Sequence, residues 1–198
     1  MSELILASAS ASRARLLKDA GLRFDTSPAR VDEDSLKASL LAEGADGRMI
    51  ADALAELKAI RISASHPGRL VLGADQVLMS RGGLVSKARD IAAAARQLRQ
   101  LRGERHELLT AAVLAKDGAP IWRHVEKSVM WMRDFSDAFL DAYLAAEGEE
   151  ILGSVGCYRL EGLGAQLFER IEGDYFSILG LPLMALLAAL RDQGAIER

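Results

Sequence analysis

Short apolar runs alternate with helical patterns of hydrophobic residues along most of this chain. Residues 4–7 are apolar, small hydroxylated residues follow, and apolar side chains then recur at helical spacing until Gly21. This order predicts a strand, a tight turn and a helix. Apolar residues also recur every three or four positions over 50–64, which predicts an amphipathic helix that ends before Pro67.

Residues 69–74 read RLVLGA, an apolar run that opens with Arg69 and is interrupted by Gly73. The run predicts a buried strand that delivers Asp75 at its end. Lys58 lies one turn after Leu54 on the preceding predicted helix, beside its apolar stripe. The pattern therefore places a carboxylate and an ammonium next to predicted core elements.

The second half of the chain mixes helices with a hairpin. Alanine-rich and leucine-rich patterns predict helices over 90–101, with Asp90 as the N-cap, over 136–146, and from Pro182 through Leu190. Two strand patterns, 108–115 and 121–133, flank a slightly longer loop at 116–118. Together the elements predict an α/β or mixed α+β fold with a mixed sheet.

Composition describes an ordinary globular chain. Its 198 residues carry 25 Lys and Arg against 28 Asp and Glu, a formal charge of −3, and half of them are hydrophobic. No repeat or linker divides the sequence, so we expect a single domain over 1–198. The slight acidity argues against polymeric nucleic acid as a partner, although it leaves a local cationic pocket open.

The cysteine content and the first residues of the chain indicate in which cellular compartment the protein is expected. Cys157 is the only cysteine, so it forms no disulfide within the chain, assembles no cysteine-based zinc site, and is expected to be a packing residue. The opening MSELILASASASR has no basic stretch, and its apolar run is too short for a signal peptide or a membrane span. These features predict a cytoplasmic protein with no membrane association.

Several common catalytic motifs are absent from the sequence. It contains no G-x-G-x-x-G, no Walker A motif and no G-x-S-x-G, and its three histidines form no H-x-x-x-H pair. The chemistry that remains is that of carboxylates, lysines, hydroxyls and backbone amides. These groups bind phosphate and hard divalent cations.

One candidate group is the predicted turn that carries Ser8, Ser10 and Arg13. Small side chains allow the backbone close to a ligand, a helix N-terminus offers unpaired N–H groups, and arginine adds a forked cation, so the turn suits a triphosphate. The plainer alternative is that Ser10 or Ser12 only caps the helix.

The second candidate group consists of two carboxylates and two lysines. Glu33 lies among three acids in a predicted loop, and Asp75 adjoins an apolar strand, where a carboxylate needs a partner such as Mg²⁺ or lysine. Lys58 and Lys87 could supply positive charge. The alternatives are a solvated loop acid at Glu33 and lysines that extend into solvent.

Blocks in a fixed order connect these candidates. Reading along the chain they are LILASASASRARLLKDAGL, VDE at 31–33, LAELKA at 54–59, VLGADQVL at 71–78, SK at 86–87, LRGERHELLT at 101–110 and ERIEGDYFSILGLPLMALLAAL. In this respect the chain resembles the Maf-type nucleoside triphosphate pyrophosphatases. The resemblance implies a two-lobed fold of the inosine-triphosphatase-like kind around a nucleotide cleft. It also implies hydrolysis of a nucleoside triphosphate to monophosphate and pyrophosphate with a divalent metal, Mg²⁺ or Mn²⁺.

The resemblance also assigns roles to individual residues. It gives Ser8, Ser10 and Arg13 to the phosphate-binding turn, Glu33 to the metal, Lys58 and Lys87 to the motif lysines, and Asp75 to the proton acceptor and the metal. This agrees with the chemistry, because water that attacks the α-phosphorus must be oriented by a carboxylate near a cation.

Departures from the common family pattern bear on the substrate. Ala11 and Ser12 replace the usual Pro-Arg, Gln76 replaces a threonine, and 153–156 read GSVG in place of D-K-A-G. The segments Asp75-Gln76, EGLG at 161–164 and LFER at 167–170 resemble the branch that acts on 7-methyl-GTP. A carboxylate at Glu161 can accept from guanine N1–H and N2–H₂. The alternative is a surface carboxylate at Glu161 and a solvated strand residue at Gln76.

Two other functions stay open at this point. The chain lacks the Asp-Lys pair of the D-K-A-G block and the arginine that Ser12 replaces, which fits a catalytically weak nucleotide-binding regulatory protein. A phosphotransferase ranks last, because the sequence shows no motif that would bind a phosphoryl acceptor. The apolar segment 181–190 fits either a homodimer interface or burial within the chain.

Overall fold

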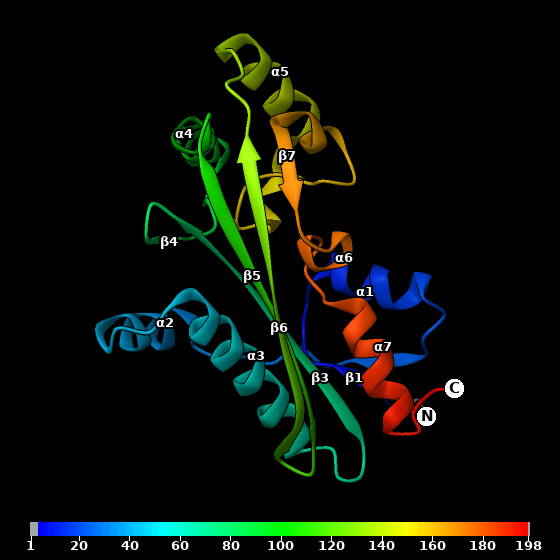
Figure 1. Ribbon diagram of the computed structural model, residues 1–198. Helices are drawn as coiled ribbons and strands as arrows, with labels where there is room; N and C mark the ends of the chain where they lie inside the picture. Colours follow the sequence, from blue (N-terminus) through cyan, green and yellow to red (C-terminus); the bar gives the residue numbers. More distant parts are fainter. Residues whose placement is uncertain (1–3, 198) are drawn as a thin grey trace. The chain divides into compact units, whose positions relative to one another are not determined.

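A mixed sheet forms the framework of the protein. The computed structural model describes residues 4–197. Its strands are β1 (Leu4–Leu6), β2 (Phe24–Thr26), β3 (Leu70–Ser80), β4 (Gly83–Val85), β5 (Arg105–Lys116), β6 (Ala119–Met132) and β7 (Phe168–Glu172). They follow the order β2-β1-β3-β5-β6-β7 with β4 beside β3. Because β1 is parallel to β2 and β3 while β4 and β7 run antiparallel to their partners, the predicted mixed α/β class is confirmed (Figure 1).

Most helices begin at a residue that caps them. The helices are α1 (Ala11–Asp19), α2 (Glu33–Ala42), α3 (Gly47–Ser63), α4 (Ile91–Leu101), α5 (Asp137–Glu147), α6 (Tyr175–Ile178) and α7 (Leu183–Asp192), with 3₁₀ turns at Gly148–Gly153 and Leu163–Leu167. A Ser or Asp side chain before each of α1 to α6 accepts a hydrogen bond from the backbone N–H three residues further on. This capping satisfies an N–H group that the helix itself leaves unpaired, and it includes the predicted cap at Asp90.

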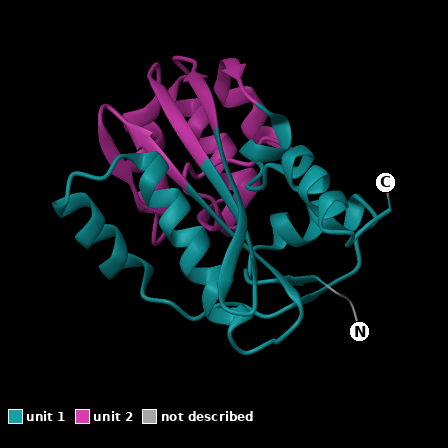
Figure 2. Cartoon of the chain, turned by 60° about the horizontal axis from the view of Figure 1, so that its bottom comes forward, with its two compact units in different colours: residues 1–76, 110–126, 174–198 teal, residues 77–109, 127–173 magenta. Residues whose placement is uncertain are grey.

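The chain divides into two compact units (Figure 2). Of the described residues, 4–76, 110–126 and 174–197 belong to unit 1, and 77–109 and 127–173 belong to unit 2. Strands β3, β5 and β6 each begin in one unit and end in the other. The expectation of a single domain over 1–198 includes residues 1–3 and 198, which lie outside the described residues, and it stays a prediction.

Alternation along the strands organises the core of unit 1. Leu4 and Leu6 of β1 belong to a cluster with residues of α1 and α7, whereas Ile5 and Val71 belong to another cluster, against which Ile62 of α3 packs. Successive strand residues point to opposite faces, so α1 and α7 cover one face and α3 covers the other. Four apolar residues of α7 pack against this core, whereas Met184 of the same helix is 62% exposed, so the possible homodimer stays a prediction.

Gly73 marks the closest approach of α3 to β3. A Cβ atom on Gly73 would lie 2.1 Å from the carbonyl oxygen of Ala55 and 2.6 Å from the amide nitrogen of Ala59. Both are backbone atoms, so they cannot move aside as a flexible side chain would. The glycine that interrupts the apolar run is therefore what allows helix and strand to pack in direct contact.

Three details of the sequence prediction were wrong. Strand β3 continues to Ser80, because 78–80 pair with β4, so Asp75 lies inside the strand and not at its end. Asp32 caps α2 and Glu33 is its first residue, so the acids 32–34 do not form a loop. The hairpin turn has only two residues, Asp117 and Gly118, which both have the positive φ angles of a type I′ turn.

Unit 2 has its own buried polar and aromatic cluster. His106 is 1% exposed, its Nε2 lies 2.8 Å from the hydroxyl of Tyr158, and both rings lie near that of Phe168. Burial lowers the pKa of His106 to about 4. The neighbouring Cys157 is buried as expected, and desolvation raises the pKa of its thiol to about 11.

Among residues 4–197, none of the helices combines the length and the apolar character that a membrane crossing requires.

The packing of α3 on β3 can be tested by adding one methyl group. We expect Gly73→Ala to lower the free energy of unfolding by about 3 kcal/mol, because the backbone of α3 must move to admit the Cβ atom. Urea unfolding measures the change. Gly83→Ala is the matched control, since its Cβ would lie 3.7 Å from the carbonyl oxygen of Ser80, an ordinary contact distance, and a similar loss in both variants would contradict the argument.

The buried imidazole predicts a dependence of stability on pH. In the unfolded chain His106 has an ordinary pKa near 6.5, whereas the folded protein holds it near 4, so between these values only the unfolded state gains the proton. Stability from this group is complete above pH 6.5 and falls as the pH drops toward 4. We expect the wild type to lose about 2 kcal/mol more than His106→Gln between pH 7 and pH 4.5. Equal losses in urea unfolding of the two proteins would refute this.

Candidate functional site

A buried lysine joins two carboxylates in unit 1. The Nζ atom of Lys58 lies 2.5 Å from Oδ1 of Asp75 and 2.7 Å from Oε1 of Glu33. Lys58 and Asp75 are each 6% exposed, whereas the side chain of Glu33 is 38% exposed. A lysine that extends into solvent is thus the wrong alternative for Lys58, because its ammonium is held by two opposite charges.

Strand alternation and helix packing bring these residues together. Val71, Gly73 and Asp75 alternate along β3, and the first two lie against α3. Asp75 therefore faces the same helix, whose Lys58 lies next to the backbone that touches Gly73. Glu33 comes from the first turn of α2, where Lys37 one turn later also pairs with it at 3.5 Å.

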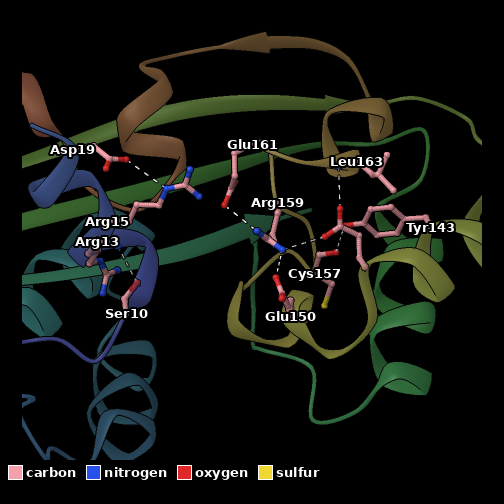
Figure 3. A network of polar contacts seen from close by, with 11 residues as sticks. Ser10, Arg13, Arg15, Asp19, Tyr143, Glu150, Cys157, Arg159, Glu161 and Leu163 are labelled. Carbon is pink, nitrogen blue, oxygen red and sulfur yellow. Dashed lines mark hydrogen bonds and ion pairs between the residues drawn. The ribbon is translucent and has the colours of Figure 1, made fainter.

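The turn between β1 and α1 forms a second polar group of unit 1. Arg13 donates from Nε to the carbonyl of Gly180 at 2.8 Å and from Nη1 to Oγ of Ser8 at 3.1 Å. Ser10 caps α1 by accepting from the backbone N–H of Arg13 at 3.4 Å (Figure 3). That Ser10 also binds a phosphate stays a prediction. Among residues 4–197, no hydrogen bond or ion pair engages Nη2 of Arg13, which leaves one edge of the fork for a ligand.

The two groups share an electrostatic environment. Burial is the main influence on Arg13 and lowers the pKa of its guanidinium, while the charges of Asp75 and Glu33 raise it. Arginine stays protonated in proteins, so a cation faces these carboxylates from the β1–α1 turn. Arg15, by contrast, pairs with Asp19 and its side chain is 71% exposed, so it does not supplement Arg13.

Gln76 points away from Asp75, toward the opposite face of β3. Its Nε2 donates to Oγ1 of Thr110 at 2.9 Å and to the carbonyls of Ser177 and Ile178 at 3.0 and 3.1 Å. The alternative of a solvated strand residue is therefore wrong. Successive side chains of a strand point to opposite faces of the sheet, so Asp75 and Gln76 contact different parts of the protein.

Lys87 and Glu161 belong to unit 2. Lys87 is exposed and follows β4. Glu161 precedes the 3₁₀ turn at 163–167, and its Oε1 lies 3.6 Å from Nε of Arg159 (Figure 3). Arg159 also pairs with Glu147 and Glu150, so Glu161 is one of three carboxylates around a single guanidinium. That Lys87 and Glu161 act on the same substrate as the unit 1 residues stays a prediction.

Sequence reasoning missed the backbone part of the site. The carbonyl of Gly180 holds Arg13, and this glycine has a φ of +113°, a conformation that L side chains rarely adopt. Thr110 and Ser177 hold Gln76. The Gly-Leu-Pro string before α7 marks a bend in the chain, but no sequence pattern shows which side chain a main-chain carbonyl will accept from.

The carboxylates fit a divalent cation of the Mg²⁺ type. No group of three or more His, Cys, Asp or Glu side chains in the described part of the chain is arranged to hold a metal by itself. Glu33 and Asp75 nevertheless face one positive charge, the ammonium of Lys58. Mg²⁺ is commonly bound by one or two carboxylates, with substrate phosphates and water completing its shell. The donor set therefore suits a metal that arrives with a phosphorylated ligand.

Curated relatives match this chain along nearly its full length. A nucleoside triphosphate pyrophosphatase of Granulibacter bethesdensis is 53% identical over 194 residues, which cover 98% of both chains. Another of Caulobacter vibrioides is 52% identical over 196 residues, covering 99% of this chain and 98% of that one. A crystal structure titled nucleoside-triphosphatase or dITP/XTP pyrophosphatase, from Mycobacterium abscessus, aligns with a TM-score of 0.44 at 16% identity, covering 98% of this chain and 99% of that one.

The family model described as Maf-like protein matches residues 3–193. Given this match and relatives that are more than half identical over the same span, the chain belongs to the Maf-like protein family.

Proposed function

We propose that this chain, acting as one Maf-like domain over 1–198, is a hydrolase that cleaves a nucleoside triphosphate to the monophosphate and pyrophosphate. The observation that carries the proposal is the contact of the buried Lys58 and Asp75 with the partly exposed Glu33, in the electrostatic environment of Arg13. The names of the relatives support the same activity.

The β1–α1 turn would bind the phosphates. Arg13 is held at Nε and Nη1, which orients its planar group and directs the remaining edge. Ser8 and Ser10 add hydroxyls, and the N-terminus of α1 favours negative charge. Since the fork is already fixed by protein contacts, little side-chain freedom is lost when a phosphate binds.

Asp75 would orient the attacking water. Its Oδ1 accepts from Lys58, while within residues 4–197 no hydrogen bond is made to its Oδ2. A carboxylate fixed on one oxygen by a buried ammonium presents the other in a defined direction, which suits a water placed in line with the departing pyrophosphate. Lys58 and Lys87 would offset the negative charge that develops on the phosphate oxygens.

Glu33 and Asp75 would hold the divalent cation, Mg²⁺ or Mn²⁺. When bound, such an ion neutralises phosphate charge and lowers the pKa of a coordinated water. Both residues lie against Lys58, so the ammonium offsets part of their negative charge before substrate arrives.

Glu161 would select the base. Its carboxylate can accept from N1–H and N2–H₂ of a guanine ring and favours the positive charge of a 7-methylated one, which points to 7-methyl-GTP or another modified nucleotide. Arg159 lies against this carboxylate and would keep it in place. Gln76, the other residue that marks this branch, contacts only protein groups through its amide nitrogen.

Product analysis and one isosteric substitution test the activity. With Mg²⁺ or Mn²⁺ we expect the wild type to release monophosphate and pyrophosphate, and Asp75→Asn to lower kcat by about 1,000-fold. The asparagine keeps the shape of the side chain and a hydrogen-bond acceptor for Lys58, which Glu33 still neutralises, so the variant should fold.

Asp25→Asn serves as the control, because it removes an exposed carboxylate on β2 that pairs with Arg69. It should leave kcat within about twofold of the wild type. Diphosphate and orthophosphate as products would contradict attack at the α-phosphorus. Nucleotide binding without turnover by the wild type would favour the alternative of a catalytically weak regulatory protein.

The selectivity of Glu161 can be measured on a panel of canonical and modified triphosphates. We expect Glu161→Gln to lower kcat/KM for 7-methyl-GTP by about 100-fold and to change kcat/KM for UTP much less, because the amide loses one acceptor and the negative charge. Glu172→Gln, at an exposed carboxylate of β7 that pairs with Arg170, is the matched control. Equal rates of the wild type on every base would rule out this role of Glu161.

A further inference from the structure

We propose that Gln76 is a positioning residue that fixes Arg13 for the substrate through the main chain of residues 177–180. The assignment of a phosphate to Arg13 rests on the proposed function. The mechanical link between Gln76 and Arg13 lies entirely within unit 1 and can be tested without substrate.

The strand separates the tasks of two neighbouring residues. Asp75 meets Lys58 on the face of β3 that α3 covers. Gln76 reaches Thr110 of β5 and the carbonyls of α6 on the other face. A single strand can therefore hold the reacting carboxylate with one side chain and, with the next, support the segment that carries the phosphate-binding arginine.

A continuous series of hydrogen bonds leads from Gln76 to Arg13. The carbonyl of Ser177 accepts from Nε2 of Gln76 at 3.0 Å and from Oγ1 of Thr110 at 2.9 Å. The same carbonyl accepts from the backbone N–H of Gly180 at 3.0 Å. The carbonyl of Gly180 then accepts from Nε of Arg13 at 2.8 Å. Ser177 is thus the point where the strands hold the turn that holds the arginine.

The turn needs such support from outside. Helix α6 spans only Tyr175–Ile178, and so short a helix has little stability of its own. Asp174 caps its first turn through the backbone N–H and hydroxyl of Ser177. At its other end, Gln76 and Thr110 donate to the carbonyls of the last two residues of α6, of which that of Ser177 also accepts from the backbone N–H of Gly180.

The orientation of the Gln76 amide follows from its neighbours. Two of its three contacts are main-chain carbonyls, which only accept, so the nitrogen must face them. Rotating the amide would bring its oxygen against both carbonyls. The amide nitrogen of Gln76 is therefore engaged by the protein, which favours a supporting role over base recognition by this group.

Hydrogen exchange of the Arg13 Nε–H group tests the link directly. In ¹⁵N-labelled protein this signal can be assigned by its loss in Arg13→Lys. We expect the group to exchange about tenfold faster in Gln76→Met, because methionine keeps the length of the side chain and removes both amide donors. Unchanged exchange would overturn the proposal.

Gln97→Met is the matched control. The amide nitrogen of Gln97 also donates to a backbone carbonyl, that of Val155 in unit 2, at 2.5 Å. The control should leave the exchange of Arg13 unchanged, and an equal acceleration would show a general loosening instead of a specific link. If Gln76→Met fails to fold, Thr110→Val removes one donor to the same Ser177 carbonyl and should shift the exchange in the same direction.

Steady-state kinetics provides the second readout. Once the wild type is shown to hydrolyse a triphosphate, Gln76→Met should raise KM about tenfold and change kcat little, because a mobile Arg13 weakens binding of ground state and transition state alike. Faster exchange together with an unchanged KM would overturn the functional part. If the wild type hydrolyses no triphosphate while Gln76→Met still exchanges the Arg13 Nε–H faster than the wild type, the link is supported and only the proposed function is refuted.

Discussion

The ammonium of Lys58 is the contact on which the arrangement of unit 1 depends. Without it, Asp75 and Glu33 would face each other as like charges, one of them buried. With Arg13 included, two basic side chains face two carboxylates, and Lys37 lies 3.5 Å from Glu33 as a further cation. Because the carboxylates offset most of this positive charge, the cluster alone attracts a polyanion only weakly, and a triphosphate gains most by arriving with a divalent cation. The donor set and the proposed metal requirement thus have one electrostatic origin.

The contact between Lys58 and Asp75 depends on the absence of a side chain at Gly73. Gly73 lets the backbone of α3 touch β3, and Lys58 then needs no more than its own length to reach Asp75. The strand presents Gln76 on its other side, where the main chain before α7 is held. The positions of the charged side chains therefore depend on uncharged contacts, namely the packing at Gly73 and the hydrogen bonds of Gln76.

The sequence predicted the elements whose signals are local and missed those that depend on tertiary partners. Asp90 was predicted as a cap because capping is a property of a few adjacent residues, and Asp75 and Lys58 were singled out because charge beside apolar runs is unusual. The start of α2 at Glu33 was missed because no residue of this helix is buried, so its hydrophobic pattern is weak. The carbonyl of Gly180 carries no sequence signal, since every residue has one.

Cys157 has a practical consequence for spectroscopy. It is the only sulfhydryl of the sequence, and its buried position with a pKa raised to about 11 keeps it protonated and shielded at neutral pH. Maleimide probes react with accessible thiolates, so they would attach to a cysteine engineered on the surface and spare the natural one. Fluorescent or spin-labelled pairs can consequently be installed without first altering any native residue.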